Sequence, residues 1–130
     1  MKKILKEDLL YPELSYQIVG ILFEVSNAMG IGFQEKYYQK AIAALLKKLG
    51  IKFKEQVVVE LKINNEVVGK GIIDFIIDEK IILEIKKGDR FLKQNIDQVF
   101  GYLKMSDLKL GILANFTSKG LIFKRIVNVR

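Results

Sequence analysis

Two carboxylates stand inside segments that are otherwise apolar and strand-like. Asp74 interrupts Ile72–Ile77, and Glu84 interrupts Ile81–Ile85. A buried ionised carboxylate without a partner costs several kcal/mol, so each of these acids needs a physical reason to be there. Because side chains in a strand alternate between faces, Glu84 and Lys86 share a face and lie about 7 Å apart along the backbone. These three residues are therefore the first candidates for a chemical site.

The spacing of the two acids allows them to meet. If their strands pair through a short turn at Asp78–Glu79, position 74 lies opposite position 83 or 84, and the carboxylates converge at the end of the sheet. Two carboxylates, a strand carbonyl and waters make a site for a divalent cation of the Mg²⁺ type. Lys86 can then hold or deprotonate an attacking water and stabilise charge on a phosphate, which suits phosphodiester hydrolysis. The alternative is a buried ion pair of Lys86 with one of the acids, without a metal.

The composition narrows the chemistry further. The chain has 130 residues, of which 50% are apolar and 28% are charged, and this indicates one folded domain over residues 1–130. It contains neither Cys nor His. Disulfides, thiolate nucleophiles, imidazole bases and His-ligated zinc are therefore excluded. Any metal must be held by carboxylates, carbonyls and water, which favours Mg²⁺ or Mn²⁺.

The charge balance favours an anionic partner. Twenty-two Lys and Arg residues stand against 15 Asp and Glu, which gives a formal charge of +7. A surplus of this size in a small domain favours nucleic acid or a membrane surface. The chain lacks the roughly 18 uninterrupted apolar residues that a membrane span needs. Its start, Met1–Asp8, is basic but is not followed by an apolar signal core, so we expect a cytoplasmic protein.

Hydrophobic periodicity predicts the elements that must position these residues. A period of 3.6 residues predicts helices, alternation predicts strands, and Asn64–Asn65 and Asp78–Glu79 are predicted turns. The expected order is α-α-β-β-β-α-β-β, an α/β fold with a mixed central sheet flanked by helices. The helices are expected at 13–29, 34–49 and about 91–105, and the strands at 57–63, 67–77, 80–86, 108–116 and 121–127.

Helices supply further polar candidates. Glu35 lies in the first turn of the second helix, where a carboxylate also gains simply from the helix dipole. In the third helix Gln94, Gln98 and Tyr102 follow one another at intervals of four residues. This ridge could contact a phosphate backbone or position Lys86, or it could be an ordinary polar face.

A basic cluster follows the strand that carries Glu84. It consists of Lys86, Lys87, Arg90 and Lys93, at the end of that strand and the start of the next helix. Cations beside the N–H groups of a helix N-terminus are suited to binding phosphate.

The order of these motifs resembles the GxxExxY family, which is assigned to the PD-(D/E)XK nuclease superfamily. The motif Gly32-x-x-Glu35-x-x-Tyr38 precedes an Ala- and Leu-rich helix, and Asp74, Glu84-Ile85-Lys86, Gln98 and Tyr102 follow in order. The resemblance extends from about Leu14 to Ile126. It implies a restriction-endonuclease-like core in which acids bind Mg²⁺. We therefore expect a Mg²⁺-dependent nuclease that hydrolyses phosphodiester bonds of nucleic acid, with DNA favoured over RNA as the substrate.

The resemblance also implies roles for individual residues. Glu35, Asp74, Glu84 and the Ile85 carbonyl would bind Mg²⁺ or Mn²⁺, and Lys86 would be the catalytic lysine. Gln98 and Tyr102 would support the site from the following helix. Together with Lys87, Arg90 and Lys93, these two residues are the predicted contacts to nucleic acid.

Two other classes of function stay open at this point. The same fold could bind nucleic acid or a protein without cleaving it. It could also serve a structural role, because alternation in Leu110–Phe116 and Leu121–Val127 would allow an exposed sheet edge to pair between two copies. A homodimer would suit the nuclease as well, since cutting two strands needs two sites.

Overall fold

The computed structural model describes residues 10–129 and has the predicted order of elements. Met1–Asp8, on which the predicted location rests, lies outside the described residues. No helix in the described part is long and apolar enough to cross a membrane. The helices are α2 (Pro12–Met29), α3 (Glu35–Lys48) and α4 (Lys93–Ser106), and the strands are β1 (Phe53–Ile63), β2 (Glu66–Ile77), β3 (Ile81–Lys87), β4 (Leu110–Thr117) and β5 (Gly120–Val127).

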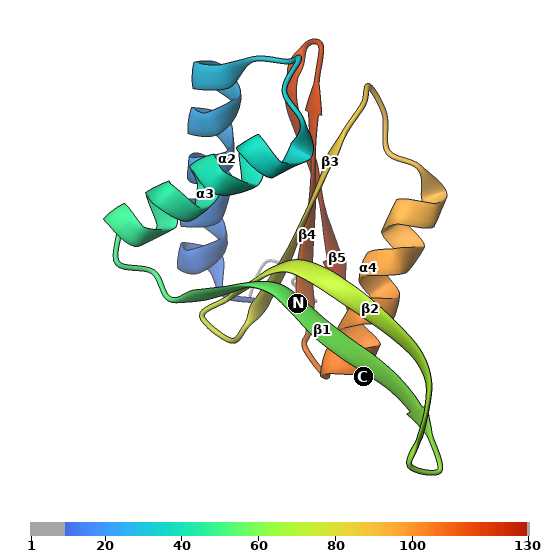
Figure 1. Cartoon of the computed structure of the whole chain (residues 1–130). Helices are drawn as coiled ribbons and strands as arrows, with labels where there is room; N and C mark the ends of the chain where they lie inside the picture. The colour runs from blue at the N-terminus through green and yellow to red at the C-terminus, as the bar shows by residue number, and fades with distance from the viewer. Residues whose placement is uncertain (1–9, 130) are drawn as a thin grey trace, which may run out of the picture.

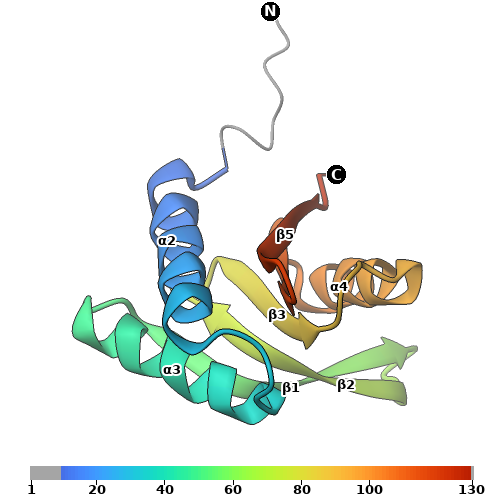
Figure 2. The same ribbon diagram turned by 90° about the horizontal axis from the view of Figure 1, so that it is seen from above.

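The strands form one mixed sheet between two layers of helix. Their order is β1-β2-β3-β4-β5, in which β3 and β4 are parallel and the other neighbours are antiparallel. Helix α4 makes the crossover between the two parallel strands. Figures 1 and 2 show α2 and α3 on one side of the sheet and α4 on the other. The predicted mixed sheet flanked by helices is therefore confirmed.

Each face of the sheet has its own hydrophobic core. On the α2–α3 face, Ile18, Leu22 and Ile42 pack against residues of β3 and β4. On the α4 face, Val99 and Leu103 complete a smaller cluster. Residues 81–85 of β3 and all of β4 are buried, as expected for central strands that are apolar on both sides.

The β1–β2 hairpin changes face at Asp74. Phe75 and Ile77 belong to the core on the α2–α3 face, but Ile73 belongs to the core on the α4 face. In a regular strand these three side chains would point the same way. On β1 the residue opposite is Gln56, whose φ of 52° is left-handed, and the ladder passes from Glu55–Phe75 to Val57–Ile73. The irregularity at Gln56 and Asp74 therefore lets the outer half of the hairpin pack under α4.

The two predicted hairpin turns form as expected. Asn64 and Asn65 have φ of 51° and 68°, and Asp78 and Glu79 have φ of 53° and 59°. Two consecutive left-handed residues are the requirement of a type I′ turn, and Asn and Asp tolerate that region better than most residues. The second turn sets the register of β2 against β3.

Phe100 and Ile72 are two apolar residues within the predicted helices and strands that are exposed. Phe100 of α4 is 37% exposed, because Val99 and Leu103 fill the core face of this helix, and the ammonium of Lys104 lies over the Phe100 ring at 4.8 Å. Ile72 is 53% exposed, because the neighbouring Ile73 points to the α4 face and the Ile72 side chain points to the opposite face of the hairpin.

The predicted sheet edge is wrong for one of its two segments. Leu110–Phe116 lies in β4, which is paired with β3 on one side and β5 on the other, so it offers no exposed edge, whereas Leu121–Val127 lies in the edge strand β5. The edges of the sheet are β1 and β5. Helix α4 also begins two residues later than expected, because the Asn115 side-chain amide donates to the Arg90 carbonyl at 3.1 Å and holds the preceding segment as a loop.

Candidate functional site

Asp74 and Glu84 meet where β2 and β3 separate. The last paired residues of these strands are Phe75 and Leu83, so the next positions along the ladder are 74 and 84. At these positions, hydrogen bonds from backbone N–H groups to the two carboxylates replace the backbone-to-backbone bonds of the ladder. The Asp74 N–H donates to Glu84 Oε1 at 2.6 Å, and the Ile85 N–H donates to Asp74 Oδ2 at 2.9 Å. Each carboxylate is thus held by a backbone N–H of the opposite strand, and each satisfies a donor that strand separation would leave unpaired.

The environment disfavours two charges at this point. Burial, and then the negative charge of Asp74, raise the pKa of Glu84 to about 8, and Glu84 is only 3% exposed. Burial also raises the pKa of Asp74, although the hydrogen bond from Ile85 and the charge of Lys86 partly counteract it. Without a cation, the carboxyl of Glu84 therefore holds its proton at neutral pH.

Lys86 and Glu35 lie within electrostatic reach of the pair. The positive charge of Lys86 lowers the pKa of both Asp74 and Glu84, and the negative charge of Glu35 raises both. Glu35 comes from the first turn of α3, which packs on the sheet beside β3. Yet in residues 10–129 no three acidic side chains lie close enough together to form a metal-binding cluster. Asp74 and Glu84 are thus brought together, while Glu35 faces the pair from farther away.

Two glutamines that were not predicted from the sequence, Gln39 and Gln56, complete the site. The Gln39 side chain hydrogen-bonds the Asp74 carboxylate, which lowers the pKa of Asp74. The Gln56 side-chain amide in turn donates to Gln39 Oε1 at 2.9 Å. Gln39 follows Glu35 by four residues, one turn of helix, and this spacing is a signal that could have identified it.

Tyr102 closes the site from the α4 face. Its ring lies so close to Gly71 that a Cβ at that position would overlap it. Burial, and then the charge of Glu84, raise the pKa of the Tyr102 phenol, which also hydrogen-bonds the Ile72 backbone. Tyr102 is 8% exposed, whereas Gln98, one turn earlier on α4, is exposed. The structure thus places Tyr102 beside the acids and Gln98 on the surface.

The basic residues lie around the end of β3. Lys87 Nζ donates to the Phe33 carbonyl at 3.2 Å, in the loop that leads into Glu35. Arg90 is exposed in the β3–α4 loop. Lys93 forms an exposed ion pair with Asp97 at 2.8 Å, a pair that contributes little to stability but leaves a cation at the start of α4.

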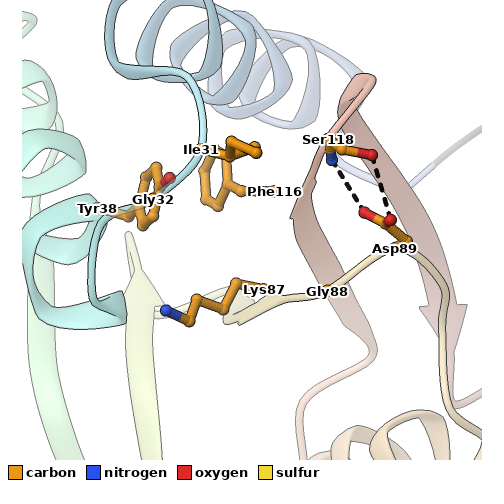
Figure 3. Close-up of a pocket in the computed structure, with 8 residues that line it drawn as sticks. All are labelled: Ile31, Gly32, Tyr38, Lys87, Gly88, Asp89, Phe116 and Ser118. Carbon is orange, nitrogen blue, oxygen red and sulfur yellow. Dashed lines mark hydrogen bonds between the residues drawn. The ribbon is translucent and has the colours of Figure 1, made fainter.

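A cavity of about 350 Å³ opens beside Lys87. Figure 3 shows that the loop with Ile31 and Gly32, the β3–α4 loop and the β4–β5 turn surround it. Asp89 fixes one wall, because its carboxylate accepts hydrogen bonds from the Ser118 N–H at 2.9 Å and the Ser118 hydroxyl at 3.2 Å. These bonds tie the β3–α4 loop, which belongs to the predicted phosphate-binding segment, to the β4–β5 turn.

The donor set fits a hard divalent cation. Asp74 and Glu84 offer carboxylate oxygens, which are the ligands that Mg²⁺ and Mn²⁺ prefer. Burial and mutual repulsion raise both pKa values, and a cation would relieve the repulsion that raises them.

A solved structure of another protein shares the fold of this chain. A crystal structure of SSO0001 superposes with a TM-score of 0.59 at 22% sequence identity, over 96% of this chain and 61% of that one. The chain thus spans 61% of the length of that protein, and the likeness indicates a shared fold. An alkaline exonuclease (LHK-Exo) from Laribacter hongkongensis gives a TM-score of 0.40 at 8% identity, over 88% of this chain and 82% of that one.

The sequence itself identifies the family. No curated protein matches the chain significantly in sequence. The pattern of the PD-(D/E)XK nuclease superfamily, however, matches residues 12–126, which run from the start of α2 almost to the end of β5. This stretch includes the acids, the lysine and the helix with Tyr102. The chain therefore belongs to the PD-(D/E)XK nuclease superfamily.

Proposed function

We propose that the protein is a metal-dependent nuclease that hydrolyses phosphodiester bonds of DNA, with Mg²⁺ or Mn²⁺ as its cofactor. One observation carries the proposal: a buried carboxylate, Glu84, and a half-buried one, Asp74, lie together where two strands separate, close to a lysine, and both have raised pKa values. Such a pair is unfavourable for the folded protein at neutral pH, so an ion-binding role explains it better than a structural one.

Asp74, Glu84 and the Ile85 carbonyl would hold the cation, and Glu35 would contribute directly or through a water. The Ile85 N–H keeps one oxygen of Asp74 in place, and the Asp74 N–H does the same for Glu84. When bound, the cation would supply a Lewis acid that lowers the barrier to attack of water on phosphorus. The chain's own contribution is to hold hard oxygen ligands together at a partly buried point between β2 and β3.

Lys86 would act on the reacting groups. It shares the face of β3 with Glu84, and its positive charge is felt by both acids. Its ammonium would donate hydrogen bonds to the attacking water or to a phosphate oxygen, and would stabilise the charge that accumulates on the phosphate. The charge of Lys86 would act more strongly here than on an open surface, because the neighbouring Glu84 is almost fully buried and water screens the interaction less.

The surface around the site would supply affinity for the substrate backbone. Lys87, Arg90 and Lys93 are exposed at the end of β3 and the start of α4, in a chain of net charge +7. Gln98 is exposed on the same helix, one turn before Tyr102. Such contacts are largely independent of sequence and weaken with salt. Membership of the GxxExxY family, and a homodimer in which two sites cut two strands, are parts of the same proposal.

Cleavage of supercoiled plasmid and end-labelled oligonucleotides in Mg²⁺ or Mn²⁺ tests the proposal. The variants Asp74→Asn, Glu84→Gln and Lys86→Met should each lose at least a hundredfold in rate, whereas the exposed control Glu24→Gln should cleave like the wild type. If each of these three single variants still cleaves at the wild-type rate, the assignment is refuted. Binding of DNA that is equal with and without Mg²⁺, and without cleavage, would instead identify a non-catalytic binding module. DNA and RNA oligonucleotides of the same sequence decide the substrate, and light scattering decides whether the protein is a dimer.

A further inference from the structure

Asp74 is the one acid of the site whose own strand is irregular. Its neighbours Ile73 and Phe75 contribute to cores on opposite faces of the sheet, so the backbone turns over at this residue. A carboxylate at such a point is not fixed by the regular pleat of the strand. Something else must hold it in the direction of Glu84 and Ile85.

The residue opposite, Gln56, is irregular as well, in its backbone conformation. It occupies the left-handed region at φ 52° in the middle of β1, where a residue other than glycine is rare. Strained backbone of this kind persists only where the surrounding structure enforces it, and it clusters at functional sites. The irregular residue of β1 is therefore directly opposite the irregular residue of β2 that carries the acid.

The chemistry of the two glutamines orients them both. Gln39 hydrogen-bonds the Asp74 carboxylate, and an ionised carboxylate can only accept. Gln39 must therefore present its Nε2 to Asp74, which leaves its Oε1 as an acceptor. Gln56 Nε2 donates to that Oε1 at 2.9 Å. The result is a directed chain from Gln56 through Gln39 to Asp74, in which each side chain has only one suitable orientation.

We propose that Gln56 and Gln39 are positioning residues, which act as one unit to aim the Asp74 carboxylate at the cation site. The strained backbone of Gln56 brings its amide to Gln39, and Gln39 fixes one side of the carboxylate while the Ile85 N–H fixes the other. In treating Asp74 as a metal ligand, this assignment rests on the proposed function. Outer hydrogen-bond partners of this kind typically change metal affinity by 10- to 100-fold when removed.

The variants are Gln39→Met, which keeps the length of the side chain without its hydrogen bonds, and Gln56→Gly, which adopts the left-handed region freely and lacks only the side chain. Gln17→Met, at an exposed position of α2, is the matched control. The first measurement needs no metal: hydrogen exchange and the proton chemical shift of the Ile85 amide, followed by NMR. We expect at least tenfold faster exchange and an upfield shift in both variants, and no change in the control.

The second measurement is Mn²⁺ affinity of the protein without nucleic acid, followed by calorimetry, together with cleavage kinetics. Affinity and kcat should fall about 10-fold in either variant, with KM for DNA within twofold of wild type. The double variant should be no worse than Gln39→Met alone, because the two side chains form one chain. An unchanged Ile85 amide, unchanged Mn²⁺ affinity in a wild type that binds Mn²⁺, or additive losses would each overturn the proposal.

The two proposals fail separately. If the wild type binds no Mn²⁺ or cleaves nothing, the nuclease function is wrong, but the Ile85 amide still decides whether the glutamines hold Asp74. If the wild type cleaves DNA and the Ile85 amide is insensitive to both substitutions, the nuclease function stands and the positioning role is wrong.

Discussion

Glu84 makes the folded protein sensitive to pH in a direction that can be calculated. Its pKa is about 8 in the folded protein, against an ordinary value of 4.5. Between these two values the unfolded chain has lost the proton and the folded protein retains it, so the stability that this group contributes is fully present below pH 4.5 and is lost as pH rises toward 8. Each pH unit in this window lowers the free energy of unfolding by about 1.4 kcal/mol. Between pH 5 and pH 8 the loss from this one group is therefore about 3–4 kcal/mol, a large share of the stability of a small domain.

The groups that face Glu84 act on this titration in known directions. The negative charges of Asp74 and Glu35 raise the pKa of Glu84 and the positive charge of Lys86 lowers it, while burial is the largest cause of the shift. The pKa of Asp74 is shifted in the same direction, so its titration adds to the same fall.

Glu84→Gln tests this calculation in the metal-free protein. Glutamine cannot ionise and still accepts a hydrogen bond from the Asp74 N–H through its carbonyl oxygen. Urea unfolding at pH 5, 6, 7 and 8 in EDTA should show a variant whose stability is much flatter with pH than that of the wild type. The exposed control Glu24→Gln should keep the wild-type slope. A Glu84→Gln protein whose stability still falls as steeply as the wild type's would show that Glu84 is not the buried, protonated group that the structure describes.

Three further outcomes follow from the same geometry. Mg²⁺ binding at pH 7 should release about one proton, because the cation must displace the proton that Glu84 holds, and calorimetry in buffers of different ionisation enthalpy measures it; binding without proton release would contradict the site. Gly71→Ala should lower the free energy of unfolding by about 1–3 kcal/mol, since its Cβ would overlap the Tyr102 ring, whereas Gly101→Ala, with open space around it, should not destabilise the protein. Lys87→Met should weaken DNA binding and lower the salt slope by about one, as measured by fluorescence anisotropy at several salt concentrations; an unchanged slope would remove Lys87 from the interface.

The order of the elements and the meeting of Asp74 with Glu84 could be predicted from the sequence because both depend on local signals. The turn at Asp78–Glu79 needs two left-handed residues, and Asp tolerates that conformation better than most residues. Once the turn is placed, the register of an antiparallel pair is set, and position 74 falls opposite position 84. Apolar residues on both faces of Ile81–Ile85 likewise mark a central strand, which is what β3 is.

Other features of the site depend on contacts between residues far apart in the chain. No periodicity in β1 or β2 indicates that the hairpin changes face, because this requires Gln56 to be left-handed opposite Asp74 and α4 to receive the outer half of the hairpin. In the sequence, Gln39 is an ordinary polar residue of an amphipathic helix. Its hydrogen bond to Asp74 arises only because that helix packs against the sheet. Phe100 has the right type for a core, yet Val99 and Leu103 already occupy the face that α4 turns to the sheet.

The sequence alone thus determined that the protein has carboxylate oxygens as candidate metal ligands and has no thiolate or imidazole ligands. It also determined that two of the acids, Asp74 and Glu84, come from adjoining strands. Only the tertiary structure decided how strongly those acids are perturbed. Burial is the largest cause of the raised pKa of Glu84, and burial is a property of the two helical layers that cover the sheet. Short-range steric preferences set the turns and the register, whereas the desolvation of a charge depends on every element packed around it.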